Sequence, residues 1–411
     1  MKRLCGATAL VCTVAAMAAP EYSGQVRPVV TVQDAATLGP MAAADEIAPG
    51  TTVLPVSNLA LETELRAQGS GLHAVATLIQ QRLEHRGTSS SGWFNELYAA
   101  GGSGGWQFSA GQRIVAWDVG YGFRPNDVVE QETRRRLLPV TADGRRLLAA
   151  EYFNATDSAA LVLVNPEQPR TQTGEREPAL ALRLYRRAGS VDLYGFARQG
   201  ARTGGSIGAA AAWVAGDALE LHASVRAVNA ADTLAPATGL IGTSGLARTN
   251  PWIAATRRRF GQALVGGTWT SADQLSLLVE AWWDGSALSS AQWQAWNDRN
   301  AQLRALAAGP APAAAVAGNL AWQGQAFNAS TNLRRDNLYA RLSWTHEHWE
   351  PAIDCLFEPS DGGRVCTATL GWQGDRVRID AGWRGTAGPA TAVLPQTPTR
   401  RVAYAALAWT F

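Results

Sequence analysis

The chain alternates apolar and polar residues over many short segments. In one of them, Val377, Ile379 and Trp383 fall on one face, while Arg378 and Asp380 fall on the other. Successive side chains of a β-strand point to opposite sides, so this alternation predicts strands with one apolar and one polar face. Segments of about ten residues also have the length of a strand that crosses a membrane at a tilt.

Eighteen such segments can be traced, and an even number is typical of bacterial outer-membrane barrels. Pro28 interrupts the first segment and would remove a hydrogen bond from its ladder. The predicted fold is all-β: a transmembrane antiparallel up-and-down barrel of about 16–18 strands with long extracellular loops. The predicted strands cover residues 25–35, 59–69, 71–86, 92–100, 104–118, 146–154, 158–165, 177–187, 190–203, 205–216, 218–231, 258–271, 274–285, 336–347, 348–358, 364–374, 375–386 and 399–411.

The connections between these segments alternate in length. Counting back from the last strand, every second connection is short, and the intervening connections are mostly long. Bacterial barrels have short periplasmic turns and longer extracellular loops, whereas a soluble β-sandwich has no reason to follow this order. The longer connections cover residues 119–145, 166–176, 232–257, 286–335 and 387–398.

Tryptophan is unusually frequent, with 16 residues in the chain. Six of them lie near a predicted periplasmic strand end and on the apolar face of their strand. Indole rings gather at membrane–water interfaces, because the ring is buried while its N–H reaches the headgroups. Core packing is the alternative, but it does not explain tryptophans at one end of every second hairpin. The predicted girdle consists of Trp106, Trp213, Trp269, Trp344, Trp372 and Trp409.

The start of the chain predicts export. Lys2 and Arg3 precede a short apolar stretch, and small residues around Ala18 offer a cleavage site. This order is typical of a secretory signal peptide. We therefore expect residues 1–19 to be removed and residues 20–411 to form the barrel.

The end of the chain places Leu407, Trp409 and Phe411 on one face. It resembles the terminal strand of Gram-negative outer-membrane barrels, which ends in an aromatic residue and serves as their assembly signal. The resemblance implies that the barrel-assembly machinery recognises Phe411. It also implies a location in the outer membrane, in contact with its lipid and lipopolysaccharide.

Cys355 and Cys366 are the only cysteines that remain after the leader. An even pair in an exported protein indicates a disulfide. The residues between them include Pro359 and Gly362, which favour a turn. The two cysteines are therefore expected to face each other across a tight hairpin.

A barrel of this size encloses water, so the polar faces of its strands should line a lumen. Rings of charge set the field that a solute meets in a pore. The alternative is that these charges pair across strands and only solvate the wall. Since both signs occur, we predict no strong ion selectivity. The predicted pore-lining residues are Arg113, Arg183, Arg226, Arg341, Arg378, Arg384, Glu220, Glu280, Asp284 and Asp380.

Residues 111–127 form the most distinctive run, in which a strand leads through Trp117 and Gly120 to a turn. This run resembles the strand-then-loop segment of plugless porin-like and alginate-export-like Gram-negative outer-membrane barrels, although Asp118 replaces the commoner glycine. The resemblance implies a solute or polysaccharide channel whose loop folds inward to form a constriction. Ordinary turn chemistry is an equal alternative. The residues implied at the constriction are Arg124, Asn126 and Asp127.

Residues 289–308 break the strand pattern. Trp293, Trp296 and Leu303 recur at helical spacing, which predicts a helix. This helix lies in the long connection 286–335, where it would either lid or partly plug the barrel or pack on its outer rim.

Two triple-arginine runs, residues 134–136 and 257–259, are predicted at the outer rim. They would attract anionic solutes or lipopolysaccharide phosphates, or simply be solvated. The formal net charge is only +2, and no basic and aromatic residues interleave across a domain. Nucleic-acid binding is therefore not expected.

The sequence offers little for catalysis. Its five histidines show no metal-ligand spacing, and it has no G-x-S-x-G, H-E-x-x-H or Walker motif. We expect no enzyme activity, cofactor or metal. The predicted function is an outer-membrane channel for small hydrophilic solutes or an exported polysaccharide. The alternative is a structural or adhesive barrel with a closed lumen, whose loops bind a partner.

Overall fold

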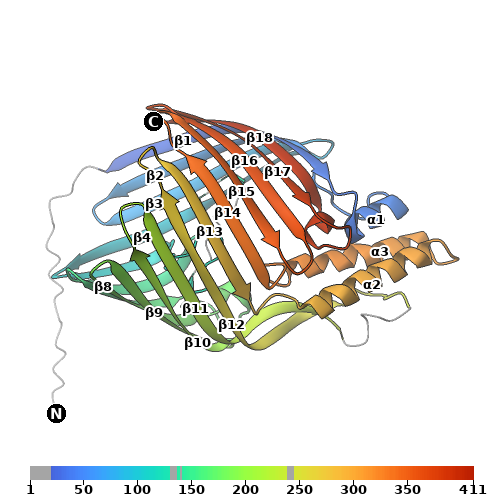
Figure 1. Ribbon diagram of the computed structural model, residues 1–411, viewed down its shortest axis with the longest axis horizontal. Helices are drawn as coiled ribbons and strands as arrows, with labels where there is room; N and C mark the ends of the chain where they lie inside the picture. The colour runs from blue at the N-terminus through green and yellow to red at the C-terminus, as the bar shows by residue number, and fades with distance from the viewer. Residues whose placement is uncertain (1–19, 130–136, 139–140, 238–244) are drawn as a thin grey trace, which may run out of the picture.

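The computed structural model describes residues 20–129, 137–138, 141–237 and 245–411. The proposed leader and the arginine run at residues 134–136 lie outside the described residues. Within them, eighteen strands form one closed antiparallel sheet (Figure 1). The strands are Glu21–Ala35 (β1), Asn58–Gly69 (β2), Leu72–Leu83 (β3), Gly87–Ser103 (β4), Trp106–Arg113 (β5), Arg145–Phe153 (β6), Asp157–Val164 (β7), Ala179–Ala188 (β8), Val191–Gly200 (β9), Gly204–Val214 (β10), Leu219–Pro236 (β11), Trp252–Thr270 (β12), Leu275–Asp284 (β13), Asp336–Trp344 (β14), Trp349–Glu358 (β15), Gly363–Gln373 (β16), Val377–Ala387 (β17) and Thr399–Thr410 (β18).

Each strand pairs with its neighbours in sequence, and β1 pairs with both β2 and β18. This last pairing closes the sheet and confirms the predicted all-β barrel. Pro28 lies within β1 and pairs with Leu61 of β2, whereas the register with β18 passes from Val26 directly to Val29. The barrel thus accepts the proline by leaving out ladder partners on one side only.

Several predicted strand ends differ from the structure, and the largest differences are in β4, which begins at Gly87, and in β5, β11 and β12. The strand predicted over residues 104–118 ends at Arg113, because the Ile114 amide donates to Glu96 Oε1 and the chain then leaves the wall. The β11–β12 hairpin reaches farther than predicted, from Pro236 to Trp252.

The two ends of the barrel differ in their connections. One end, here called the turn end, has eight connections of two to four residues and holds Pro20 and Phe411. The other, the loop end, carries the long connections predicted from the sequence. Three of its connections are nevertheless short: residues 84–86, 201–203 and 359–362.

Three α-helices lie together at the loop end (Figure 1). They are Gly39–Ile47 (α1), Ser290–Ala307 (α2) and Ala313–Gln323 (α3). α2 occupies the predicted helical range and begins with a capping box between Ser289 and Gln292. Short 3₁₀ helices cover Gly174–Arg176 (η1), Gly324–Asn328 (η2) and Leu394–Gln396 (η3).

The helices form their own apolar cluster, in which Leu303 of α2 packs with Val316 and Leu320 of α3. The sequence analysis did not predict α1 or α3. None of the described helices is both long and apolar enough to span a membrane.

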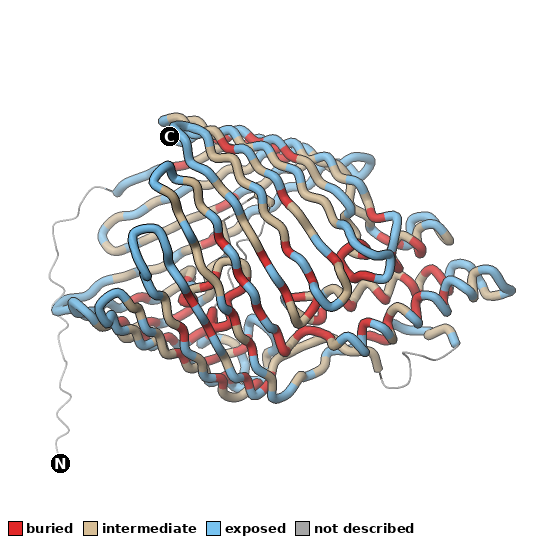
Figure 2. The backbone as a smooth tube through the Cα atoms, in the orientation of Figure 1, coloured by how far each residue is buried: buried red, intermediate tan, exposed pale blue. Residues whose placement is uncertain are grey.

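The period-two pattern appears as two faces of the wall. Exposed and less exposed positions alternate along the strands (Figure 2). The outward face carries exposed leucine, valine and tryptophan side chains such as Leu277, Val279 and Trp283, and the intervening Glu280 and Trp282 are buried. The inward face therefore holds the polar residues and the contacts with the inward loop.

Candidate functional site: the lumen and its inward loop

The chain after β5 enters the barrel and packs against one side of its wall. We call residues 114–129 the inward loop. Its Val115 and Trp117 join an apolar cluster with Val162 of β7 and Phe196 of β9. Its Phe123 joins a second cluster formed by β12 to β15. The loop thus fills the half of the lumen that faces β6 to β13.

Glu280 of β13 clamps the tip of this loop. Its side chain is fully buried and accepts hydrogen bonds from the amides of Tyr121 and Gly122, both at 2.6 Å. His222 Nε2 of β11 lies 2.9 Å from the same carboxylate. A Cβ at Gly266 of β12 would come within 2.7 Å of this histidine nitrogen. The wall is therefore shaped around the clamp.

A second set of contacts fixes the loop to β10 and β11. Ser224 Oγ donates to Asp118 Oδ1 at 2.8 Å, and Asn126 Nδ2 donates to Ser224 Oγ at 2.9 Å. Asp118 Oδ2 also accepts from the Asn126 amide at 2.6 Å. A Cβ at Gly208 of β10 would lie 1.9 Å from Asn126 Oδ1, so only glycine leaves room for this side chain.

Arg124, Asn126 and Asp127 do not line the open space, although the family resemblance implied a constriction there. All three are buried. Arg124 donates to the Asp118 carbonyl and lies 3.2 Å from Asp127, which accepts from the Trp117 amide. They hold the loop in shape because a charge enclosed between loop and wall needs partners within reach. The loop residues that do face the cavity are Ile114, Ala116 and Tyr121.

The other half of the lumen holds a cavity of about 1310 Å³, which we call the lumen cavity. It is bordered by β1 to β4, by β14 to β18 and by the three loop residues just named, and also by Leu137, residues 141–143, Arg145 and Glu175. Four of the predicted pore-lining residues face it: Arg341, Arg378, Arg384 and Asp380.

Most charges around the lumen cavity are paired with one another, across strands or within one strand. Arg341 lies 3.3 Å from Asp354, and Arg378 lies 2.9 Å from both Glu350 and Asp380. The sequence analysis named these arginines but missed Asp354 and Glu350, although both are polar positions in the alternating pattern of β15.

The sequence analysis also missed a charged pair on β1 and β2. Arg27 of β1 donates to Glu62 of β2 at 2.8 Å. The predicted Arg384 donates to Thr367 at 2.9 Å. Arg27 was overlooked because Pro28 obscured the alternation of the first strand.

The other predicted pore-lining residues are inward but lie outside the lumen cavity. Arg113 pairs with Glu151 at 2.6 Å. Arg226 donates to the Pro125 carbonyl of the inward loop at 3.0 Å, so it supports the loop from behind. Glu220 lies 3.8 Å from His222, toward the turn end.

Two more residues of this group have structural partners. Arg183 lies over the ring of Tyr194, with 5.4 Å to its centroid. Asp284 accepts from Asn332 at 2.8 Å and from Gln262 at 3.0 Å, so it ties the start of the long connection to β12.

The six predicted girdle tryptophans lie on the outward face near the turn end. Five of them are between 39% and 48% exposed, and Trp372 is less exposed. The Trp344 indole N–H donates to the Asp273 carbonyl of a turn at 2.9 Å. Trp349, next to Trp372 across β15 and β16, belongs to the same band and was not predicted.

Cys355 and Cys366 form the predicted disulfide. They are directly opposite in the β15–β16 hairpin, and their Cα atoms are 4.1 Å apart. They share the outward face with Ile353, so the bond lies away from the lumen.

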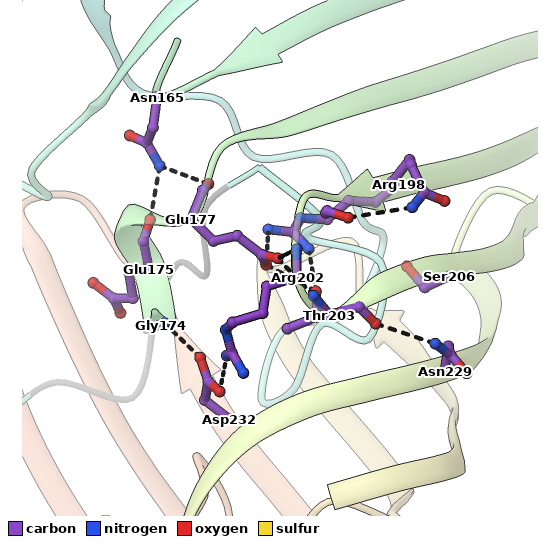
Figure 3. Close-up of polar contacts among 12 residues, drawn as sticks. Asn165, Gly174, Glu175, Glu177, Arg198, Arg202, Thr203, Ser206, Asn229 and Asp232 are labelled. Carbon is purple, nitrogen blue, oxygen red and sulfur yellow. Dashed lines mark hydrogen bonds and ion pairs between the residues drawn. The ribbon is translucent and has the colours of Figure 1, made fainter. Parts of the chain in front are cut away.

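A polar network holds the loop end together beside β8 to β11 (Figure 3). Glu177 accepts hydrogen bonds from the amides of Arg202 and Thr203 at 2.6 and 2.7 Å, and from Arg198 at 3.1 Å. Burial raises the pKa of Glu177, but these donors outweigh it and hold the pKa below its ordinary value. Among the described residues, no group of three or more His, Cys, Asp or Glu side chains could hold a metal.

Comparisons with known proteins show which solved structures share this fold. No family model and no curated protein sequence matches the chain. The structure is similar to Acinetobacter baumannii OccAB1, with 8% identity over 95% of this chain and 96% of that one and a TM-score of 0.53. It is also similar to Pseudomonas aeruginosa OpdK, solved with vanillate, with 8% identity over 95% and 98% and the same TM-score. These likenesses show that the chain has the fold of a porin-type β-barrel.

Proposed function

We propose that the protein is an outer-membrane channel for small hydrophilic solutes. The observation that carries this proposal is the lumen cavity of about 1310 Å³, which is lined by charged side chains and bounded by a loop folded in from the wall. A closed structural barrel has no need of a hydrated, charged interior. The outward apolar face and its tryptophan band support a position in lipid.

Planar-bilayer recording tests the proposal. The purified protein is expected to give discrete conductance steps, and a folded protein that gives none at any voltage overturns it. Liposome swelling with sugars of increasing size, and with vanillate as an anionic probe, then measures the size and charge of the solutes that pass. Rapid permeation of long polysaccharides and not of small sugars would instead favour an exporter.

Arg384 provides the matched test of the lumen cavity. Arg384→Gln removes a positive charge from its wall, so the ratio of anion to cation permeability is expected to fall. Arg401 of β18 lies on the outward face, next to Asp34 of β1, and Arg401→Gln serves as the control. An unchanged reversal potential for Arg384→Gln would mean that ions take another route.

We further propose that assembly depends on Phe411. This residue is 51% exposed and pairs through its backbone with Gly24, which closes the sheet at the turn end. Deleting Phe411 is expected to reduce the amount inserted in cell membranes, while refolding in detergent continues. Equal loss of both would show that Phe411 acts through stability alone.

A further inference from the structure

The outward face of β7 to β12 contains a groove near the loop end. Its volume is about 810 Å³, and we call it the lipid groove. Its sides include Leu161, Leu180 and Ile207, each at least 46% exposed. The hairpin β11–β12 extends past β9 and β10 toward the loop end.

Register explains the shape of this groove. Ala197, Ile207, Ala227 and Gly261 pair in turn across β9, β10, β11 and β12, so they form one row. Three of the four are small: Ala197 lies on one side of Ile207, and Ala227 and Gly261 lie on the other. These small side chains leave room for a hydrocarbon chain against the lipid-facing wall.

The next row toward the loop end is polar. Gln199 pairs with Gly205, and Asn229 and Arg259 continue this line across β11 and β12. Asn229 is held in place because its Nδ2 donates to the Thr203 carbonyl of the network in Figure 3, at 3.4 Å. The groove therefore passes from an apolar floor to a polar head.

Arg259 is the charged residue at the polar end of the lipid groove that lies on its outward face. It is exposed, and within the described part of the chain it has no ion-pair or hydrogen-bond partner. Its φ of 51° lies in the left-handed region, an uncommon conformation for a non-glycine residue inside a strand. Arg257 lies two residues before it on the same strand, and Arg257 and Arg335 both donate to the Ala287 carbonyl. No described carboxylate forms an ion pair with these three arginines.

The height of this cluster matches a membrane boundary. Ten residues separate Arg259 from Trp269 on β12, and at about 3.3 Å per residue and about 40° tilt they span about 25 Å. That equals the apolar band of an outer-membrane barrel, with the tryptophans at one edge and the arginines at the other.

We propose that the lipid groove binds one lipopolysaccharide molecule, with an acyl chain on the small-residue row and a lipid A phosphate at Arg259. The positive charge of the arginines favours an anionic lipid. Their height at the edge of the apolar band places that lipid in the leaflet at the loop end. The assignment to lipopolysaccharide rests on the proposed outer-membrane location, but it does not require that the barrel conduct.

Native mass spectrometry of the protein in lipopolysaccharide-free detergent, titrated with bis-phosphorylated lipid A, tests the proposal. We expect one retained lipid A per barrel. Arg259→Asn, which tolerates the left-handed backbone, should weaken binding at least fivefold, whereas Arg259→Lys should retain it within twofold. Arg401→Asn is the control, because Arg401 is an outward arginine at the same end without this groove.

A second variant tests the groove itself. Ala227→Trp fills its floor and should weaken lipid A binding while heat-modifiable gel migration shows an intact barrel. The proposal is overturned if Arg259→Asn and Ala227→Trp both bind lipid A as tightly as the wild type. It is also overturned if the wild type binds dephosphorylated lipid A as tightly as the bis-phosphorylated form. If the wild type is oligomeric and Ala227→Trp is monomeric, the groove binds a second copy of the chain and not a lipid, which also overturns the proposal. Bilayer conductance, measured on the same samples, reports the channel proposal separately.

Discussion

At the scale of single residues, buried polar groups decide where the inward loop lies. Glu280, Ser224 and Asn126 are all inward, and each meets a group about one hundred or more residues away in sequence. Burying such groups is unfavourable unless they are hydrogen-bonded, so loop and wall depend on each other. Alternation in the sequence identified Glu280 as inward, but it could not identify the amides of Tyr121 and Gly122 as its partners.

Glu280→Ala should loosen the inward loop. Each charge-assisted hydrogen bond contributes about 1.5–3 kcal/mol, and the variant leaves two loop amides without an acceptor. The single-channel current is therefore expected to become noisier, with new sub-conductance levels. Glu220→Ala is the control, because Glu220 faces the lumen without touching the loop. Indistinguishable noise in the two variants would show that Glu280 does not hold the loop.

Glu177 should make the loop end sensitive to acid. A carboxyl group with a lowered pKa stabilises the folded state above its unfolded pKa, and this contribution is lost as pH falls through the folded value. Amide exchange at Arg202 and Thr203, corrected for its intrinsic pH dependence, is expected to stay constant from neutrality down to the ordinary glutamate pKa and to rise as the pH falls further. Glu177→Gln should show the raised exchange at every pH, whereas the exposed Glu175→Gln should not.

At the scale of elements, hairpins are the units that build the wall. Their alternation and turn residues are local, so the sequence identifies them well. The ends of β5, β11 and β12 differ from prediction because they depend on neighbours: Glu96 draws Ile114 out of the wall, and β11 and β12 extend each other. α1 and α3 have no side-chain cap at their N-termini, and their apolar faces are covered by one another, by α2 and by Leu246 of the β11–β12 connection.

The β15–β16 disulfide should stabilise its hairpin without shaping the lumen. Replacing both Cys355 and Cys366 by serine is expected to lower the midpoint of heat-induced gel-shift, since a cross-link over a short loop contributes up to about 3 kcal/mol. Conductance should stay the same, because the bond lies on the outward face. An altered conductance with an unchanged midpoint would contradict this view.

At the scale of the whole molecule, closure of the sheet separates an outward face suited to lipid from an inward face suited to water. The outward face is apolar over most of the wall, and the inward face holds paired charges around the lumen cavity. A sheet without free edges satisfies its backbone groups internally, which is the condition for strands to cross hydrocarbon.

The intact barrel should accordingly depend on detergent or lipid. Unheated protein is expected to migrate compactly in gels and to shift after boiling, and removal of detergent should cause aggregation. Circular dichroism before and after boiling checks that the shift follows loss of the sheet. A stable monomer in plain buffer would rule out the membrane assignment.

The sequence by itself determined the strands, their inward and outward faces, the disulfide and the tryptophan band, because each depends on a period of two or on neighbouring residues in a hairpin. Only the tertiary structure decided which half of the lumen the inward loop fills, which charges pair and where the lipid groove lies. These features arise where residues distant in sequence meet, as with Asn126 and Gly208 or Tyr121 and Glu280. A local sequence pattern shows that a residue points inward, but it does not show which distant residue it will contact.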